Sequence, residues 1–199
     1  MESLRGNKAV KWAVLAAVAA AITIPVGASA ATDSSSIEAT VSSVISVTSS
    51  GTVAITVTPT GAGAESAAAS DTVTVNSNDA DGYNLTLSSS DATATMAGFK
   101  DGGITSNGST LAVTSGTYAA PAALSANSWG WRVDGLGTFG ITGTTTYAGM
   151  PINSSAQNIK STTTTASAEV TTVKYAVKVD TTKPNGVYKD TVTYTATVK

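Results

Sequence analysis

The chain contains no cysteine and no histidine among its 199 residues, and only 12% of its residues are charged. Without cysteine, the fold cannot rely on disulfides and must be held by buried apolar side chains and sheet hydrogen bonds. The absence of both residues also excludes the Ser-His-Asp and Cys-His catalytic sets and the usual zinc and copper ligand sets. A glycosidase needs only two carboxylates, but the aspartates stand at predicted turns or strand ends. We therefore expect no enzyme and no cofactor.

The first thirty residues have the order of a secretory signal peptide. Arg5, Lys8 and Lys11 precede an uncharged apolar run over residues 12–26, which is too short to span a bilayer comfortably. The run ends in Pro25, Gly27 and a small-residue triplet with Ala28 and Ala30 at the positions that signal peptidase reads. The sequence predicts a signal helix within residues 1–30, cleavage after Ala30, and contact with a membrane only before that cleavage.

Cleavage would leave 8 basic and 12 acidic side chains, and therefore a mature charge of −4. A net negative chain is a poor partner for nucleic acid. About 170 residues suffice for one core of ordinary size. We expect a flexible leader over residues 31–36 and a single domain over residues 37–199, secreted or held at the cell surface.

Threonine and serine dominate the composition, whereas residues that favour helices are few. Threonine suits the outward face of a strand, because its branched Cβ favours extended backbone and its hydroxyl tolerates water. Alternation of apolar and polar residues predicts strands over the following segments. They are 37–47, 53–57, 72–75, 83–88, 110–113, 128–133, 139–142, 172–179 and 191–198.

Residues 76–82 are rich in Asn, Asp and Gly, which tolerate the backbone conformations of a tight turn. We therefore expect strands 72–75 and 83–88 to form an antiparallel hairpin. Several amphipathic strands that each need a cover favour two antiparallel sheets packed face to face. The predicted fold is an all-β, Greek-key, immunoglobulin-like β-sandwich that follows the signal helix.

The C-terminal segment 183–195 contains the pattern P-x-G-x-Y-x-D-T-V-T. This pattern resembles the closing hairpin of bacterial surface β-sandwiches such as spore-coat-U-type pilin-like domains and WxL-type cell-wall proteins. Residues 128–133 are similar to the tryptophan motif of the WxL group, with Trp131 where that motif has leucine. The spore-coat-U type usually carries cysteines, which this chain lacks. The resemblance implies an envelope location and a sandwich fold, and it transfers no functional residue.

Two tryptophans are the main candidates for a binding site. Trp129 and Trp131 are two residues apart, so on a strand both indoles project from one face. The two indoles either anchor the core or form a platform on which sugar rings stack. The platform hypothesis is favoured if Tyr118 and Tyr147 lie nearby. Asn78, Asp79 and Asp81 before Gly82 weakly resemble a calcium loop, although a plain hairpin loop explains them better.

These observations lead to two hypotheses about function. The first is a non-catalytic structural protein of the envelope, a pilus or a fibre, in which strand 37–47 adds to the sheet of a neighbouring copy. The second is an adhesin module that binds cell-wall or host glycans, or a receptor, through Trp129 and Trp131.

Overall fold

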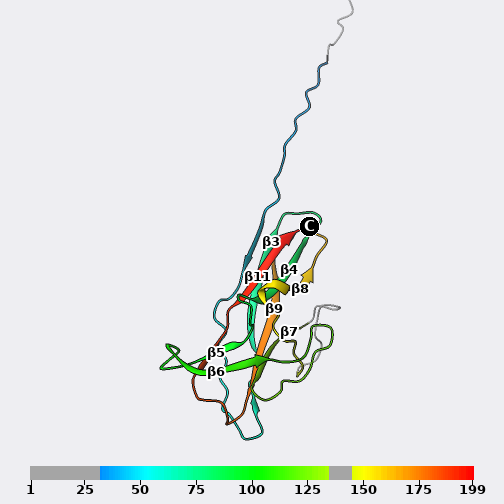
Figure 1. Ribbon diagram of the computed structural model, residues 1–199. Coiled ribbons are helices and arrows are strands. Elements are labelled where there is room, and N and C mark those ends of the chain that lie inside the picture. The colour runs from blue at the N-terminus through cyan, green and yellow to red at the C-terminus, as the bar shows by residue number, and fades with distance from the viewer. Residues whose placement is uncertain (1–31, 135–144) are drawn as a thin grey trace, which may run out of the picture. The chain divides into compact units, whose positions relative to one another are not determined.

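The computed structural model describes residues 32–134 and 145–199, and within these ranges the chain is all-β, with one short 3-10 turn and no α-helix (Figure 1). The strands before the middle of the chain are β1 (Ile45–Thr48), β2 (Ala64–Glu65), β3 (Ala69–Ser77), β4 (Tyr83–Ser89), β5 (Met96–Lys100) and β6 (Thr105–Val113). Those that follow are β7 (Ser128–Val133), β8 (Gln157–Ser161), β9 (Ala166–Val179), β10 (Val187–Lys189) and β11 (Val192–Val198), with the turn η2 (Asn153–Ser155) before β8.

The strands form two sheets. The first is a curled, mixed sheet in the order β1-β3-β9-β7-β6-β5-β10, with β2 also paired to β9. It is mixed because β6 and β7 run parallel, whereas its other pairs are antiparallel. The second sheet has the order β11-β4-β8 and is antiparallel. The prediction of an all-β chain with two sheets is confirmed, whereas the prediction that both sheets are antiparallel is wrong for the first.

One ribbon passes from one sheet to the other. β11 pairs with β4 in the second sheet, and β10, which directly precedes β11, pairs with β5 in the first. The chain turns this corner at Asp190 and Thr191, where the Ser90 amide donates to the Thr191 carbonyl at 2.8 Å. The segment that resembles a closing hairpin therefore does not pair with β9, the strand that precedes it.

The apolar side chains lie between the two sheets. β3 contributes Val73 and Val75 and β4 contributes Leu85 and Leu87, all with no exposed surface. β7 is buried along its whole length, because its outer face is also covered. A Cβ at Gly130 would lie 2.8 Å from the Ala148 carbonyl oxygen, so glycine permits this close cover.

The predicted hairpin between strands 72–75 and 83–88 is wrong. β3 pairs with β1 and β9, whereas β4 pairs with β11 and β8, so residues 78–82 connect two sheets. Both strands contribute side chains to the same core, so each buries its apolar face there while pairing in a different sheet. Gly82 adopts a φ of +88° in this connection, as its turn composition predicts.

Two other predicted strands differ from the structure. The strand expected over 37–47 is reduced to β1, and residues 37–44 pair with no sheet edge. Residues 53–57 keep the predicted alternation of half-buried and exposed side chains but form no strand. At residues 53–57 the sequence predicts the facing of the side chains, whereas residues 37–44 are all exposed. Strand assignment also needs a hydrogen-bonding partner.

Some predictions concern residues outside the described part of the chain. They are the signal helix, the cleavage positions Ala28 and Ala30, the start of the leader at residue 31 and the strand 139–142. The contacts divide the chain after Thr40, and Val41–Lys199 form a unit of their own. In the described ranges there is no helix with the length and apolarity needed to cross a membrane.

Candidate functional site

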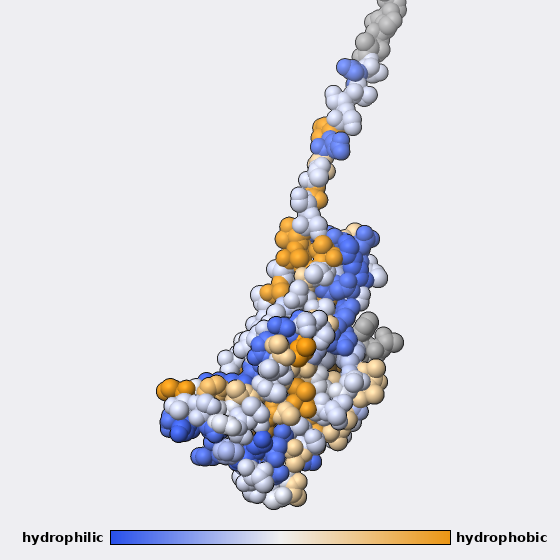
Figure 2. Space-filling view, in the orientation of Figure 1, coloured by the Kyte–Doolittle hydropathy of each residue, from blue (hydrophilic) through white to orange (hydrophobic). Residues whose placement is uncertain are grey.

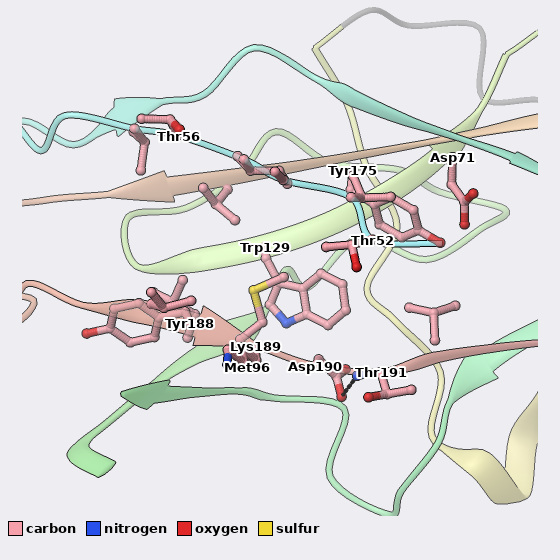
Figure 3. A pocket seen from close by; sticks show the side chains of 18 of the residues that line it. Thr52, Thr56, Asp71, Met96, Trp129, Tyr175, Tyr188, Lys189, Asp190 and Thr191 are labelled. Atoms are coloured by element: carbon pink, nitrogen blue, oxygen red, sulfur yellow. Dashed lines mark hydrogen bonds between the residues drawn. The ribbon is translucent and has the colours of Figure 1, made fainter. Parts of the chain in front are cut away.

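An open groove of about 860 Å³ lies between two stretches of extended chain, residues 49–57 and residues 186–194 (Figure 3). The first stretch continues from β1 and the second comprises β10, the corner and the start of β11. The two stretches run in opposite directions. Residues 45–60 run parallel to β9. The strand pairings that lead from β9 through β7, β6 and β5 to β10 make β10 antiparallel to β9. We call these stretches the two flanks of the groove.

The backbone of the first flank has no partner. Within the described chain, residues 51–59 belong to no strand pair and make no backbone hydrogen bond. Val53, Ile55 and Val57 are half-buried against the core while the residues between them are exposed. This stretch is thus a strand in conformation and amphipathicity that lacks a neighbour, and such backbone groups favour pairing with another strand.

The second flank is an edge as well. β11 pairs only with β4, and β10 pairs only with β5, so one side of each strand has no partner among the described residues. At the corner, residue Asp190 departs from regular pairing. One border of the groove is thus a stretch of extended chain that belongs to no sheet, and the other consists of the free edges of β10 and β11.

The floor of the groove is apolar. It is formed by Met96 of β5, Leu111 of β6, Trp129 of β7, and Val177 and Val179 of β9. Figure 3 shows the Trp129 ring and the Met96 side chain near its centre. Trp129 is only 1% exposed, and its indole N–H has no hydrogen-bond acceptor in the described ranges.

One end of the groove is polar and ties its borders together. Ser50 donates to Asp71 Oδ1 through its amide at 3.0 Å and its hydroxyl at 2.5 Å. The hydroxyls of Tyr175 and Tyr194 lie 2.6 Å apart and share a hydrogen bond. Burial raises the pKa of both tyrosines.

Asp190 lies on the second flank near the same end (Figure 3). Its Oδ1 accepts from the Thr191 amide at 2.8 Å and from the Ser89 hydroxyl at 3.2 Å. Its Oδ2 has no partner in the part of the chain that the structure describes. Burial raises the pKa of this carboxyl above its ordinary value. Asp190 is thus a half-buried acidic residue at this end of the groove.

The four predicted ligand-binding residues do not share one surface. Trp131 is fully buried, stacks on Tyr118 with ring centroids 5.5 Å apart, and donates its indole N–H to the Gly149 carbonyl at 3.0 Å. Burial raises the pKa of Tyr118 to about 12. Trp129 and Trp131 both belong to the main core, whereas Tyr147 belongs to a separate cluster with Leu124.

Tyr147 packs instead with Arg132, whose guanidinium lies 5.2 Å from its ring centre. Arg132 also donates to the Tyr147 hydroxyl at 3.3 Å and pairs with Asp134 at 3.1 Å. Burial raises the pKa of Tyr147. The aromatic residues therefore divide between two clusters, and neither indole presents an open face to solvent.

The residues of the weak calcium candidate hold the chain just before β1. Asn78 accepts from the Val44 amide at 2.7 Å and donates through its side-chain amide to the Ser42 carbonyl at 2.9 Å. Its own backbone amide donates to the Val44 carbonyl at 3.2 Å. Asp79 accepts from the Ser43 hydroxyl and the Asp81 amide, each at 2.9 Å. We call these contacts of residues 42–44 the Asn78 clamp.

Residues 32–44 form no strand and are exposed throughout. Their large apolar side chains are open to solvent, with exposed fractions of 93% for Ile37, 82% for Val41 and 64% for Val44. Figure 2 shows apolar surface on the extended segment. Such a run of exposed apolar residues is typical of an interaction segment.

Sequence reasoning missed the groove. Its flank at residues 53–57 was recognisable as an amphipathic strand, but nothing in that pattern shows which edge lacks a partner. The floor residues come from four strands, so only the three-dimensional pairing brings them together. Among the described residues no cluster of three or more His, Cys, Asp or Glu side chains suits a metal ion.

Comparison with known protein families, with curated proteins and with solved structures found no match to this chain. The groove and the segment before β1 are therefore the features of the chain that bear on its function.

Proposed function

We propose that this chain is an exported, non-catalytic structural protein of the cell surface, a component of the envelope, a pilus or a fibre, that associates by accepting a β-strand into its groove. The observation that carries the proposal is an apolar floor bordered by an unpaired extended stretch on one side and by the free edges of β10 and β11 on the other. The predicted signal peptide supports export.

Strand addition suits this groove for two physical reasons. An inserted strand satisfies backbone donors and acceptors that are otherwise left to water at the edges, and it places alternate side chains on the floor. Covering the groove also removes from water the exposed parts of its half-buried apolar residues, such as Val53, Ile55 and Met96, which stabilises the complex by about 25 cal/mol for each Å². In this proposal the fold is a Greek-key β-sandwich that lacks one strand and is completed by association.

Binding of glycans through an aromatic platform receives less support. Trp129 and Trp131 are 1% and 0% exposed, so a sugar ring has no open indole face on which to stack. Their burial among the core residues favours the reading in which both indoles anchor the domain.

One observation favours a second candidate, glycoside hydrolysis. Asp71 and Asp190 both line the groove, and a carboxyl with a raised pKa, as at Asp190, is suited to act as a general acid. Asp71, however, is 4% exposed and already accepts two hydrogen bonds from Ser50. Screening the protein and its Asp190→Asn variant against polysaccharides tests this candidate, which requires turnover that the substitution abolishes.

Expression of the full chain in a bacterium that exports it tests the main proposal. We expect the protein in the surface or medium fraction, with Ala31 as its first residue. Sedimentation and electron microscopy should show assemblies that grow with concentration. A protein that stays monomeric at every concentration, alone and in extracts of the cell surface, would contradict the proposal.

A further inference from the structure

We infer that the strand received by the groove is residues 34–41 of a second copy of this chain. This inference rests on the function proposed above and names the partner for the same groove. It makes the protein self-complementary, because each copy carries one groove and one exposed segment.

The alternation of the segment matches the groove. Ile37, Ala39 and Val41 fall on one side of an extended strand, and Glu38 and Thr40 fall on the other. An inserted strand would thus place three apolar side chains on the floor formed by Met96, Leu111, Trp129, Val177 and Val179. The polar side chains would face the solvent at the mouth of the groove.

The lengths also match. The exposed segment 32–44 has thirteen residues and the first flank, 49–57, has nine, so at about 3.3 Å per residue the eight residues 34–41 extend over about 26 Å, most of the flank. The segment is already extended in conformation, and no part of residues 32–44 is committed to a sheet. Insertion therefore requires no regular structure to be lost.

Polarity assigns the direction of the inserted strand. Ser34, Ser35 and Ser36 form the polar start of the segment, and Asp71 and Asp190 mark the polar end of the groove. Serine hydroxyls suit that polar end better than the apolar end beside Val177 and Val179, where they would lack partners. The apolar residues 37–41 then extend towards Val177 and Val179.

This direction fixes a register. The inserted strand runs parallel to the flank 49–57 and antiparallel to β10 and β11. Residue Ser36 then lies beside Thr52, and residue Thr40 lies beside Thr56. Figure 3 shows Thr52 and Thr56 well separated along the same flank, so the two positions report on different parts of the inserted strand.

The Asn78 clamp prevents a chain from filling its own groove in this way. It holds residues 42–44 at the start of β1, and Val44 lies six positions before Ser50, which bonds to Asp71 at the polar end of the groove. To fold back over that distance of about 20 Å, the same chain would need residues 38–43 beside β1. Ala39 and Val41 would then lie beside β1 and would not reach the floor, and Ser34–Ser36 would lie beside residues 52–54 instead. A second copy has no such restriction.

Cross-linking between two variants tests the inference. The chain has no cysteine, so introduced thiols are the only ones present. Thr40→Cys and Thr56→Cys chains, unfolded together and refolded under mild oxidation, are expected to form a disulfide-linked dimer of unlike chains. Thr40→Cys mixed with Thr52→Cys is the matched control and is expected to give little, since these positions lie about four residues out of register.

A second pair of variants measures the apolar match. Ala39→Asp places a carboxylate on the floor, and Thr40→Asp places the same group at the mouth. We expect Ala39→Asp to reduce assembly by about tenfold or more, because an unpaired buried carboxylate is costly, and Thr40→Asp to preserve it. Residue 39 is exposed in the single chain, so neither change should alter the circular dichroism of the monomer.

The outcomes separate this inference from the proposed function. Assemblies that persist in Ala39→Asp, without a 40–56 cross-link, would overturn the inference and leave strand addition by another partner standing. A cross-link through position 52 in place of position 56 would overturn the assigned direction and register. A cross-link that forms only within a single chain carrying both cysteines would show that the chain fills its own groove, which also overturns it.

Discussion

The hydroxyls of Tyr175 and Tyr194 lie 2.6 Å apart and connect β9 of the curled sheet with β11 of the second sheet. This contact closes the groove at its polar end, where Asp71 and Ser50 join the first flank to β3. Hydrogen bonds thus connect the strands around the groove at its polar end.

The tyrosine pair predicts a loss of stability in Tyr194→Phe. The substitution removes a buried hydrogen bond and leaves the Tyr175 hydroxyl without its partner, which costs about 1 kcal/mol in free energy of unfolding. Urea unfolding followed by circular dichroism measures this change. Tyr188→Phe is a suitable comparison, because the Tyr188 hydroxyl donates to the Pro184 carbonyl within its own turn. Equal stability of Tyr194→Phe and the parent chain would contradict the role of the pair.

The same pair predicts a dependence of stability on alkaline pH. Burial raises the pKa of both tyrosines in the folded state, so the folded protein retains protons that the unfolded chain releases above about pH 10. The resulting stability is fully present below pH 10 and declines as the pH rises through the raised pKa values. Urea unfolding at pH 8 and pH 11 should show a smaller loss for Tyr194→Phe than for the parent chain.

Trp131 is predicted to be a core anchor. It is fully buried and stacks on Tyr118, so Trp131→Ala should lower the free energy of unfolding by about 3–5 kcal/mol. Ile104→Ala is the control, since Ile104 is 82% exposed and its truncation should change stability by less than about 0.5 kcal/mol. An unchanged melting temperature in Trp131→Ala, with loss of glycan binding, would instead favour the adhesin hypothesis.

Gly82 is predicted to be required by both its conformation and its surroundings. Its φ is +88°, and an added Cβ would lie 2.4 Å from the Thr162 carbonyl oxygen. Gly102 has a similar φ of +71° but open space around it. Gly102→Ala should therefore cost about 1 kcal/mol from backbone strain alone, and Gly82→Ala should cost clearly more. Thermal unfolding of the two variants compares these costs, and equal losses would contradict a steric role for Thr162.

The Asn78 clamp is predicted to control the segment before β1. Asn78→Ala removes two hydrogen bonds to residues 42–44 and should speed hydrogen exchange at the Val44 amide. Asp81→Ala is the control, because Asp81 contributes only its backbone amide to this network. Since Asn78 and Asp79 oxygens already accept hydrogen bonds, millimolar calcium should leave the melting temperature unchanged. A calcium-dependent rise in melting temperature that Asp79→Asn abolishes would instead support a calcium site.

The sequence predicts the strands well where apolar alternation coincides with pairing. Segments 128–133, 172–179 and 191–198 correspond to β7, most of β9 and β11, because their alternating side chains find both a core and a neighbouring edge. Val53, Ile55 and Val57 show the limit of the pattern. Their facing follows from the sequence, whereas the absence of a partner depends on how distant strands are arranged.

The same limit explains the error at residues 72–88. A turn rich in Asn, Asp and Gly is compatible with a hairpin and with a connection between sheets, and local residues do not distinguish the two. The spacing of Trp129 and Trp131 likewise does not show whether they are buried, because two indoles on one face of a strand suit a core as well as a binding platform. Tertiary packing places Trp129 on the groove floor and Trp131 beside Tyr118.

Hydrogen exchange along the first flank tests the central claim most directly. The amides of residues 51–58 make no hydrogen bond within the described chain, so in the monomer we expect them to exchange rapidly. In the assembled protein we predict strong protection of residues 51–58 together with residues 34–41, because the two segments become paired strands. Assemblies in which residues 51–58 exchange as fast as in the monomer would contradict the claim that the groove receives a strand.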